Sequence, residues 1–166
     1  MRRDDRPDLY SEAERRRRDA TPWTLVQGIL APVQFAIFLV SLLLVLRTLA
    51  TGEGAAVANA SVVLKTLALY AIMITGSLWE KAVFGRYLFA PAFFWEDAVS
   101  MLVLALHTAY LAALAVDALD LRGLMLLALA AYAAYVINAT QFLLKLRAAR
   151  AGAPARPAPV LTGAAP

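Results

Sequence analysis

The sequence contains no cysteine and only one histidine among its 166 residues. The absence of cysteine excludes a disulfide, a thiolate zinc site, an iron–sulfur cluster and a cysteine nucleophile, and one histidine excludes a site built from several imidazoles. Charge is also scarce, because 17% of the residues are charged, whereas a soluble domain usually has about 25%. The apolar residues, 61% of the chain, are gathered into long runs with almost no charge. This pattern excludes an ordinary soluble domain.

Four of these runs reach the length of about 20 mostly apolar residues that a membrane-spanning helix needs. They cover residues 23–49, 55–83, 91–116 and 123–144. Pro22 suits the first position of the first helix, and we expect Pro91 to open the third helix in the same way. The sequence therefore predicts an all-α integral membrane protein, with a four-transmembrane-helix bundle over residues 21–148.

Basic residues are divided unequally between the two sides of the predicted bundle. Those on the side of both termini are Arg2, Arg3, Arg6, Arg15, Arg16, Arg17, Arg18, Lys81, Arg86, Lys145, Arg147, Arg150 and Arg156. The opposite side has only Arg47 and Arg122. Because cytoplasmic loops carry the excess of Lys and Arg, we predict that the N- and C-termini are both cytoplasmic.

The segments that flank the bundle are polar or of low complexity. Residues 1–20 form a basic arm in which Ser11 and Glu14 have the spacing of a capping box, so we expect a short interfacial helix there. A run of four arginines, residues 15–18, is suited to nucleic acid in principle, but beside a membrane span it favours anionic lipid. We therefore expect membrane lipid and no nucleic acid as a partner. Residues 149–166 are rich in Ala and Pro and are predicted to be disordered.

Polar side chains recur on one face of each predicted span. In chain order they include Gln34, Ser41, Lys65, Tyr70, Glu80, Glu96, Ser100, His107, Asn138 and Lys145. A charged residue at the centre of a membrane helix costs about 2.5–3.5 kcal/mol, so such residues usually face the interior of a bundle. Gln34 and Asn138 also fit the more common role of amides in spans, which is to join helices by hydrogen bonds.

The depth of these residues predicts a polar chamber. Glu80 ends one span and Glu96 begins the next after a short loop, so both should lie at similar heights, about one turn inside the boundary. His107 lies roughly 16 Å deeper than Glu96, and Lys65 reaches a comparable depth. We expect a chamber that opens to the cytoplasm, with His107 and Lys65 at its floor and carboxylates at its rim. This pattern alone leaves an enzyme and a carrier equally open.

Three long stretches of the chain resemble the bacteriochlorophyllide 3-vinyl hydratase family of anoxygenic phototrophs. They are YSEAERRRRDATPWTLVQGILAPVQFAIFLVSL at 10–42, LYAIMITGSLWEKAVFGRYLFAPAFFWEDAVSMLVLALHTAYL at 69–111 and LALAAYAAYVINATQFLLKLR at 127–147. The resemblance implies a hydro-lyase of the bacterial inner (intracytoplasmic) membrane. Such an enzyme adds water to the vinyl group of a chlorophyllide and gives the 1-hydroxyethyl group in bacteriochlorophyll synthesis. A non-catalytic tetrapyrrole carrier or assembly factor remains the alternative.

Hydration of a vinyl group requires a proton donor, a base and negative charge near a developing cation. Two carboxyls in a poorly solvated site supply all three, because burial and mutual repulsion leave one protonated and the other ionised. We predict that Glu80 and Glu96 are this pair, with Asp97 as the substitute. Asp97 and Lys81 also fit an ordinary ion pair at the membrane boundary.

The remaining site residues are predicted to bind the chlorophyllide-type tetrapyrrole. His107 is expected to bind the magnesium of the substrate, or less readily to act as the acid. Lys81 and Arg86 at the rim are expected to hold the propionate of the substrate. Further binding residues are Lys65, Tyr70, Gln34 and Asn138. We expect no cofactor, since the magnesium belongs to the substrate, and we expect either a homo-oligomer or contact with other enzymes of bacteriochlorophyll synthesis.

Overall fold

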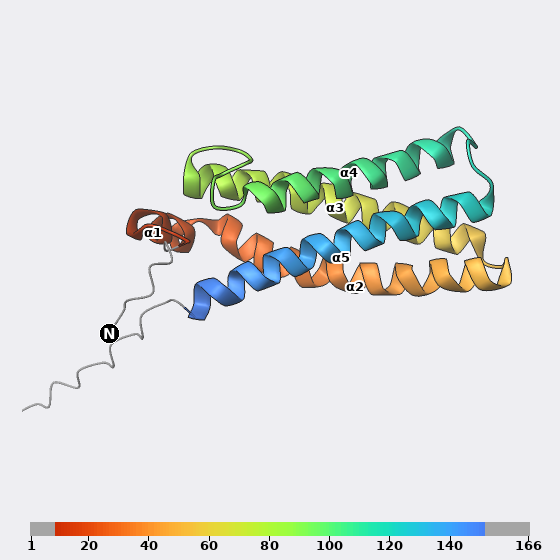
Figure 1. Cartoon of the computed structure of the whole chain (residues 1–166), viewed down its shortest axis with the longest axis horizontal. Helices are drawn as coiled ribbons and strands as arrows, with labels where there is room; N and C mark the ends of the chain where they lie inside the picture. The colour runs from red at the N-terminus through yellow and green to blue at the C-terminus, as the bar shows by residue number, and fades with distance from the viewer. Residues whose placement is uncertain (1–8, 152–166) are drawn as a thin grey trace, which may run out of the picture.

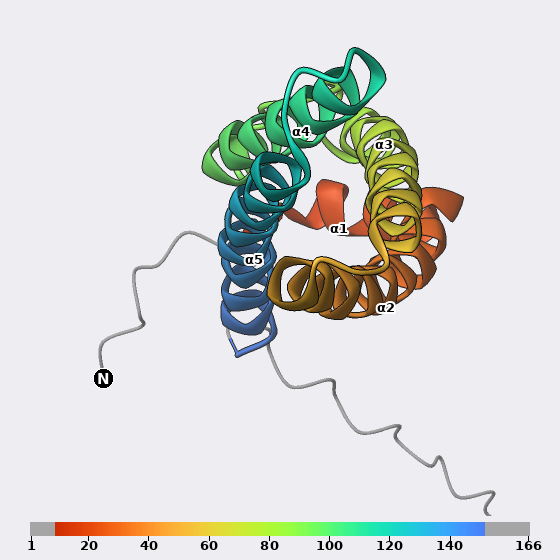
Figure 2. The ribbon, with the colours of Figure 1, turned by 90° about the vertical axis from the view of Figure 1, so that its right-hand side faces the viewer.

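The computed structural model describes residues 9–151, which contain five helices. In chain order these are α1 (Glu12–Ala20), α2 (Pro22–Thr51), α3 (Ala55–Phe84), α4 (Phe94–Ala115) and α5 (Leu121–Ala151). Helices α2 to α5 form an elongated bundle, and α1 lies at one end of it (Figure 1). Seen along the bundle, the long helices form a ring in the order α2, α3, α4, α5 (Figure 2). The prediction of an all-helical bundle is confirmed.

The bundle is apolar on its outer surface and carries polar groups inside. Leu25, Leu43 and Leu64 are among the many large apolar side chains exposed on the outside. Fully buried side chains include Lys65 and His107. This is the reverse of a water-soluble protein, and α2, α3, α4 and most of α5 are long and apolar enough to cross a membrane. The chain is therefore a multi-pass membrane protein.

The observed helix boundaries agree with the predicted spans to within two residues, except at the start of α4 and at the end of α5. Pro22 is the first residue of α2, as predicted, and α2 continues through Pro32. The prediction that Pro91 opens a helix is wrong, because α4 begins at Phe94. Residues 91–93 form a turn instead, in which the Phe93 N–H donates to the Ala90 carbonyl at 2.8 Å. The segment from Gly85 to Phe93 is thereby left free to fold against the end of the bundle.

The expected flanking segments are described only in part. Helix α5 runs to Ala151, past the expected boundary of the bundle at residue 148. The first eight residues of the basic arm, with Arg2, Arg3 and Arg6, lie outside the described residues, as does the expected disordered tail from residue 152.

Helix α1 is a capped helix held against the end of α3. The Ser11 N–H donates to the Glu14 carboxylate at 2.7 Å and the Glu14 N–H donates back to the Ser11 hydroxyl, which confirms the capping box. The N–H and the hydroxyl of Ser11 both donate to the Glu14 carboxylate and lower its pKa. Arg17 Nε donates to the Val83 carbonyl at 2.7 Å, and Tyr10 stacks on Phe84. Burial in this contact raises the pKa of Tyr10. Helix α1 therefore covers the same end of the bundle as the loop between α3 and α4.

Candidate functional site

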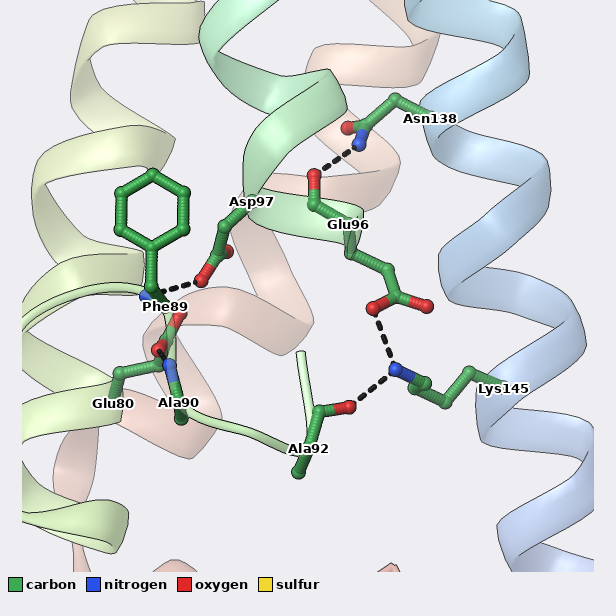
Figure 3. Close-up of polar contacts among 8 residues, drawn as sticks. All are labelled: Glu80, Phe89, Ala90, Ala92, Glu96, Asp97, Asn138 and Lys145. Carbon is green, nitrogen blue, oxygen red and sulfur yellow. Dashed lines mark hydrogen bonds and ion pairs between the residues drawn. The ribbon is translucent and has the colours of Figure 1, made fainter. Parts of the chain in front are cut away.

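Two carboxyl groups meet at the α1 end of the bundle. Glu80, near the end of α3, and Asp97, in the first turn of α4, are both buried. Their side chains lie within hydrogen-bonding reach of each other, and Figure 3 shows them converging on the loop between the two helices. This contact fixes Glu80 and Asp97 at one level of the bundle.

The backbone of the loop supplies the hydrogen-bond donors to this pair. The Phe89 N–H donates to the Asp97 carboxylate at 2.7 Å, and the Ala90 N–H donates to the Glu80 carboxylate at 3.1 Å (Figure 3). Phe89 has a left-handed φ of 58°, which is uncommon for a residue with a Cβ and costs of order 1–3 kcal/mol. The strained residue and its neighbour each direct a main-chain N–H at one of the carboxyls. The loop is therefore held in an unusual conformation at the point where it contacts the pair.

Glu96 points to a different partner. Its carboxylate forms an ion pair with Lys145 of α5, with 2.5 Å between Nζ and Oε2, and Lys145 also donates to the Ala92 carbonyl (Figure 3). The expected pairing of Glu80 with Glu96 is therefore not the one that the structure has. Glu96 and Asp97 are neighbours in the first turn of α4, about 100° apart around the helix, so they face different neighbours. Asp97 faces α3, whereas Glu96 faces α5.

Asn138 joins α5 to the start of α4. Its side-chain N–H donates to the Glu96 carbonyl at 2.8 Å, and its side-chain oxygen accepts from the Ser100 hydroxyl at 3.2 Å. Together with Lys145, Asn138 fixes the first turns of α4 against α5. This is the helix-joining role that the sequence left open for this amide.

His107 lies deeper in the bundle, with one ring nitrogen unoccupied. Its side chain is fully buried, and Nδ1 lies 2.8 Å from the Val103 carbonyl. Because a carbonyl only accepts, Nδ1 must carry the proton, and Nε2 is left with a free lone pair. Nε2 has no hydrogen-bond partner among the described residues. Such a nitrogen is suited to bind a metal ion that a ligand brings with it.

Lys65 is buried among aromatic rings. Its Nζ lies 3.6 Å from the centroid of the Tyr135 ring and 6.0 Å from that of Phe38. It is close enough to His107 for an electrostatic interaction between them. Within residues 9–149, Nζ makes no hydrogen bond. A buried amine without an acceptor is costly, so Lys65 is a second interior group that lacks a partner.

Each of the four long helices contributes one buried polar atom of this kind. Within the described side chains, the buried atoms that lack a hydrogen-bond partner are Gln34 Nε2, Lys65 Nζ, His107 Nε2 and Gln141 Oε1. Buried polar groups in native proteins are nearly always paired, so such atoms require an explanation. These four atoms, one on each of α2, α3, α4 and α5, are therefore candidates for contact with a ligand inside the bundle.

The remaining predicted residues lie at the margins. Tyr70 is on the outer seam between α3 and α4, where its hydroxyl and that of Thr108 are 2.8 Å apart. Lys81 is exposed at the bundle end and donates to the Gly85 carbonyl, with Tyr87 also near. Arg86 is exposed in the same loop. The structure thus separates these three from the interior groups.

The interior is more closed than the sequence suggested. His107 and Lys65 were expected to form the floor of a chamber open to the cytoplasm, but both are fully buried. Aromatic side chains fill the space around them, with Phe38 in contact with both Tyr132 and Tyr135. Because empty space in a core destabilises a protein, the close packing of these rings around the polar groups stabilises the bundle.

Some functional groups were not identified from the sequence. A pattern of side chains does not show which main-chain N–H groups donate, so the donors of Phe89 and Ala90 could not be found. The pairing of Lys145 with Glu96 depends on which helix packs against α4, which the sequence does not show. Gln141, by contrast, is placed by helical periodicity on the polar face of the fourth span with Asn138 and Lys145, so the sequence does indicate it.

Comparisons with known proteins agree with one another. A family model described as 2-vinyl bacteriochlorophyllide hydratase (BCHF) matches residues 10–148. A protein of Cereibacter sphaeroides with that name is 66% identical over 142 residues, which cover 86% of this chain and 88% of the relative. Its namesake in Rhodobacter capsulatus is 63% identical over 145 residues, which cover 87% of this chain and 84% of the relative. No solved structure gives a significant match to the chain.

Proposed function

The chain belongs to the 2-vinyl bacteriochlorophyllide hydratase family, and from this premise we propose that its buried pair Glu80 and Asp97 performs the hydration. The protein is a hydro-lyase of bacteriochlorophyll synthesis that acts on the vinyl group of a tetrapyrrole. The family is named for this hydratase activity and not for the non-catalytic binding of a tetrapyrrole. The contact between two buried carboxyls is the observation that supports their catalytic role.

The proposed chemistry uses the pair as one acid and one base. Two buried carboxyls in contact repel each other if both are ionised, so together they hold a single proton. The protonated carboxyl gives its proton to the terminal vinyl carbon, and the π electrons form the new C–H bond. The adjacent carbon becomes a cation that the macrocycle delocalises. The oxygen of water bonds to that carbon, and the ionised carboxyl takes the proton that water loses.

The cycle is balanced and restores the pair. One water is consumed and one vinyl group becomes a 1-hydroxyethyl group. The proton of the first carboxyl is now in the methyl group of the product, and the second carboxyl carries a proton from water, so the pair again holds one proton. While the cation exists both carboxyls are ionised, and their negative charge stabilises it in a site that excludes bulk water. No step requires a redox change, and we propose that the enzyme works without a cofactor of its own.

The backbone donors and the ion pair position the catalytic groups. The Phe89 and Ala90 N–H groups each donate to one carboxyl, so both keep a fixed orientation through the cycle. The carboxylate of Glu96 is held in an ion pair with Lys145 of α5 and is therefore directed away from the pair of Glu80 and Asp97. We assign Glu96 and Lys145 to positioning, and we propose Asp97 as the partner of Glu80 in place of Glu96.

The assay for this proposal follows the optical spectrum of the tetrapyrrole. Hydration removes the vinyl group from conjugation with the ring, so the product absorbs at shorter wavelength than the substrate. Purified protein supplied with the vinyl substrate should produce this blue shift, and variants that lack one carboxyl of the pair should bind the substrate without it. A blue shift at the wild-type rate in those variants would refute the assignment.

We propose that His107 binds the magnesium of the substrate through Nε2. We expect His107→Ala to weaken binding of the magnesium-containing substrate, while turnover stays measurable at high substrate concentration. A magnesium-free analogue should bind the wild type and the variant about equally, because neither then forms the metal bond. Binding is measured by optical titration. A variant that binds normally but does not turn over would exclude the metal-ligand role and favour an acid role for His107.

The substrate is proposed to enter from the lipid through the seam between α3 and α4. A flat apolar macrocycle partitions into the membrane, and Tyr70 and Thr108 hydrogen-bond across this seam immediately beside His107. Gln34 and Asn138 lie inside the bundle, where they can contact a bound ring. At the end of the bundle, Lys81 and Arg86 are exposed, and their proposed role is to bind the propionate of the substrate at the surface before the ring enters the interior.

We propose that this end of the bundle faces the cytoplasm, in a bacterial inner (intracytoplasmic) membrane. The unequal distribution of Lys and Arg supports this orientation. The arginines of α1 then face anionic lipid, and copies of the chain or other enzymes of the same synthesis are the expected membrane neighbours. Reporter fusions after Arg150 should be cytoplasmic, and fusions within Gly52 to Gly54 should be on the opposite side. Reporters on one side only would contradict this topology.

A further inference from the structure

Lys65 is a buried charged-type side chain inside the bundle to which the proposed chemistry gives no role. It is fully buried near the middle of α3, and its Nζ has no hydrogen-bond acceptor among the described residues. The Tyr135 ring covers one side of Nζ at 3.6 Å. An aromatic face is attractive to an amine, but it cannot take the several N–H bonds that a lysine offers. At least one donor therefore remains for a ligand.

A purely structural role does not account for a lysine at this position. An apolar side chain of similar length would fill the space between Phe38 and Tyr135 without the cost of burying an amine. Ionisable residues inside membrane spans are typically functional for this reason. The contact of Lys65 with a ring and its lack of an acceptor both indicate that a ligand supplies the acceptor.

Three interior groups follow one another along the axis of the bundle. The contact between Glu80 and Asp97 sets a common level on α3 and α4. His107 is ten residues further along α4, and Lys65 is fifteen residues from Glu80 along α3 in the same direction. At the helical rise these separations are about 15 Å and about 22 Å, so the backbone of Lys65 lies about 7 Å beyond that of His107. The order is carboxyl pair, histidine, lysine.

The substrate presents three groups in the same order. The magnesium is at the centre of the macrocycle, and the vinyl group is on one edge. On the opposite edge is the ketone oxygen of the fused five-membered ring. With the magnesium at His107 and the vinyl group directed at the carboxyl pair, the ketone edge is directed at Lys65.

We propose that Lys65 donates a hydrogen bond from Nζ to the ketone oxygen on the edge of the macrocycle opposite the vinyl group. The assignment rests on the proposed placement of the vinyl group at Glu80 and Asp97. Lys65 thereby determines which edge of the ring enters the interior first. A ring inserted the other way round would leave the Lys65 amine buried without an acceptor, which disfavours that orientation.

The direct test is resonance Raman spectroscopy of the ring bound to the protein. Hydration does not change the ketone, so its C=O band can be read whether or not the vinyl group has reacted. We expect a band at lower frequency than that of a free carbonyl in the wild type, and a band at the free position in Lys65→Met. Lys65→Gln retains an N–H donor and should keep part of the shift. Arg47→Met, at an exposed arginine with no role in the proposed site, should match the wild type.

Kinetics give a second readout with a substrate that lacks the ketone oxygen. The wild type should lose about 10- to 100-fold in kcat/KM on this analogue, the range for leaving one buried donor without its partner. Lys65→Met should have about the same kcat/KM on the substrate with the ketone oxygen and on the analogue without it. It should also be at least as resistant to unfolding as the wild type without substrate, since it removes a buried amine that has no acceptor.

Each outcome supports or overturns the assignment. A free ketone band in the wild type, or a shifted band that persists in Lys65→Met, would overturn it. A shift of the neighbouring ester band instead of the ketone band would also overturn it. If Glu80 proves dispensable for turnover, the proposed catalytic pair fails, whereas a ketone band that still depends on Lys65 would establish the hydrogen bond independently.

Discussion

Replacing Glu80 with glutamine, or Asp97 with asparagine, should lower turnover by at least about 10²-fold, within the 10²–10⁴-fold that a positioned acid or base contributes. Each amide keeps a carbonyl oxygen that can accept the Ala90 or Phe89 N–H, so the loop contacts can persist. What each variant loses is the ability to exchange a proton. Because the two carboxyls act as a unit, the double variant should be little worse than the more impaired single variant.

The matched control is Glu96→Gln, at a carboxyl that is also buried at the start of α4 but pairs with Lys145. Its effect on turnover should be much smaller than that of Asp97→Asn when the two folded proteins are compared. Turnover is read from the blue shift, and substrate binding from an optical titration of each variant. If Glu96→Gln impairs turnover and Asp97→Asn does not, the catalytic pair is Glu80 with Glu96.

Lys145→Met should give the largest loss of stability among these variants. It leaves the Glu96 carboxylate, whose side chain is 8% exposed, without its cation, and it removes the donor to the Ala92 carbonyl. Breaking a fully buried ion pair costs about 3–5 kcal/mol. The Lys145 side chain is 25% exposed, so we expect a loss at or below about 3 kcal/mol in the free energy of unfolding. Denaturation in detergent, followed by helical circular dichroism, measures it.

The double variant separates lost charge pairing from lost packing. Glu96→Gln in the Lys145→Met background removes the uncompensated carboxylate, so it should recover a large part of the stability. Lys81→Met changes an exposed lysine at the same end of the bundle and should shift stability by no more than about 0.5 kcal/mol. If the Lys145→Met protein is as stable as the Lys81→Met protein, the ion pair contributes nothing to the free energy of unfolding.

The bundle and its interior faces followed from the sequence because length and helical period are local properties. Runs of apolar residues determine four helices, and a 100° step correctly placed Glu96, Ser100 and His107 together on the buried face of α4. The start of α4 was misplaced at Pro91, since a proline suits both a turn and a first helical position.

The pairing of the carboxyls could not be predicted in the same way. Periodicity states which residues share a face, but not which neighbouring helix that face meets. Glu96 and Asp97 are adjacent in sequence and equally near the membrane boundary, and only the packing of α3 and α5 on either side of α4 assigns them their partners. The main-chain donors at Phe89 and Ala90 depend on a left-handed residue that no side-chain pattern indicates.

The position of Lys65 has a consequence for how the chain is built into the bilayer. As α3 enters the membrane, a lysine near its centre costs about 2.5–3.5 kcal/mol. The ring that lies against Nζ belongs to Tyr135 on α5, which follows α2 to α4 in the chain. The ion pair of Glu96 with Lys145 also requires α5. Insertion of α2 to α4 therefore yields only a partly assembled bundle, and both interior centres are completed when α5 docks.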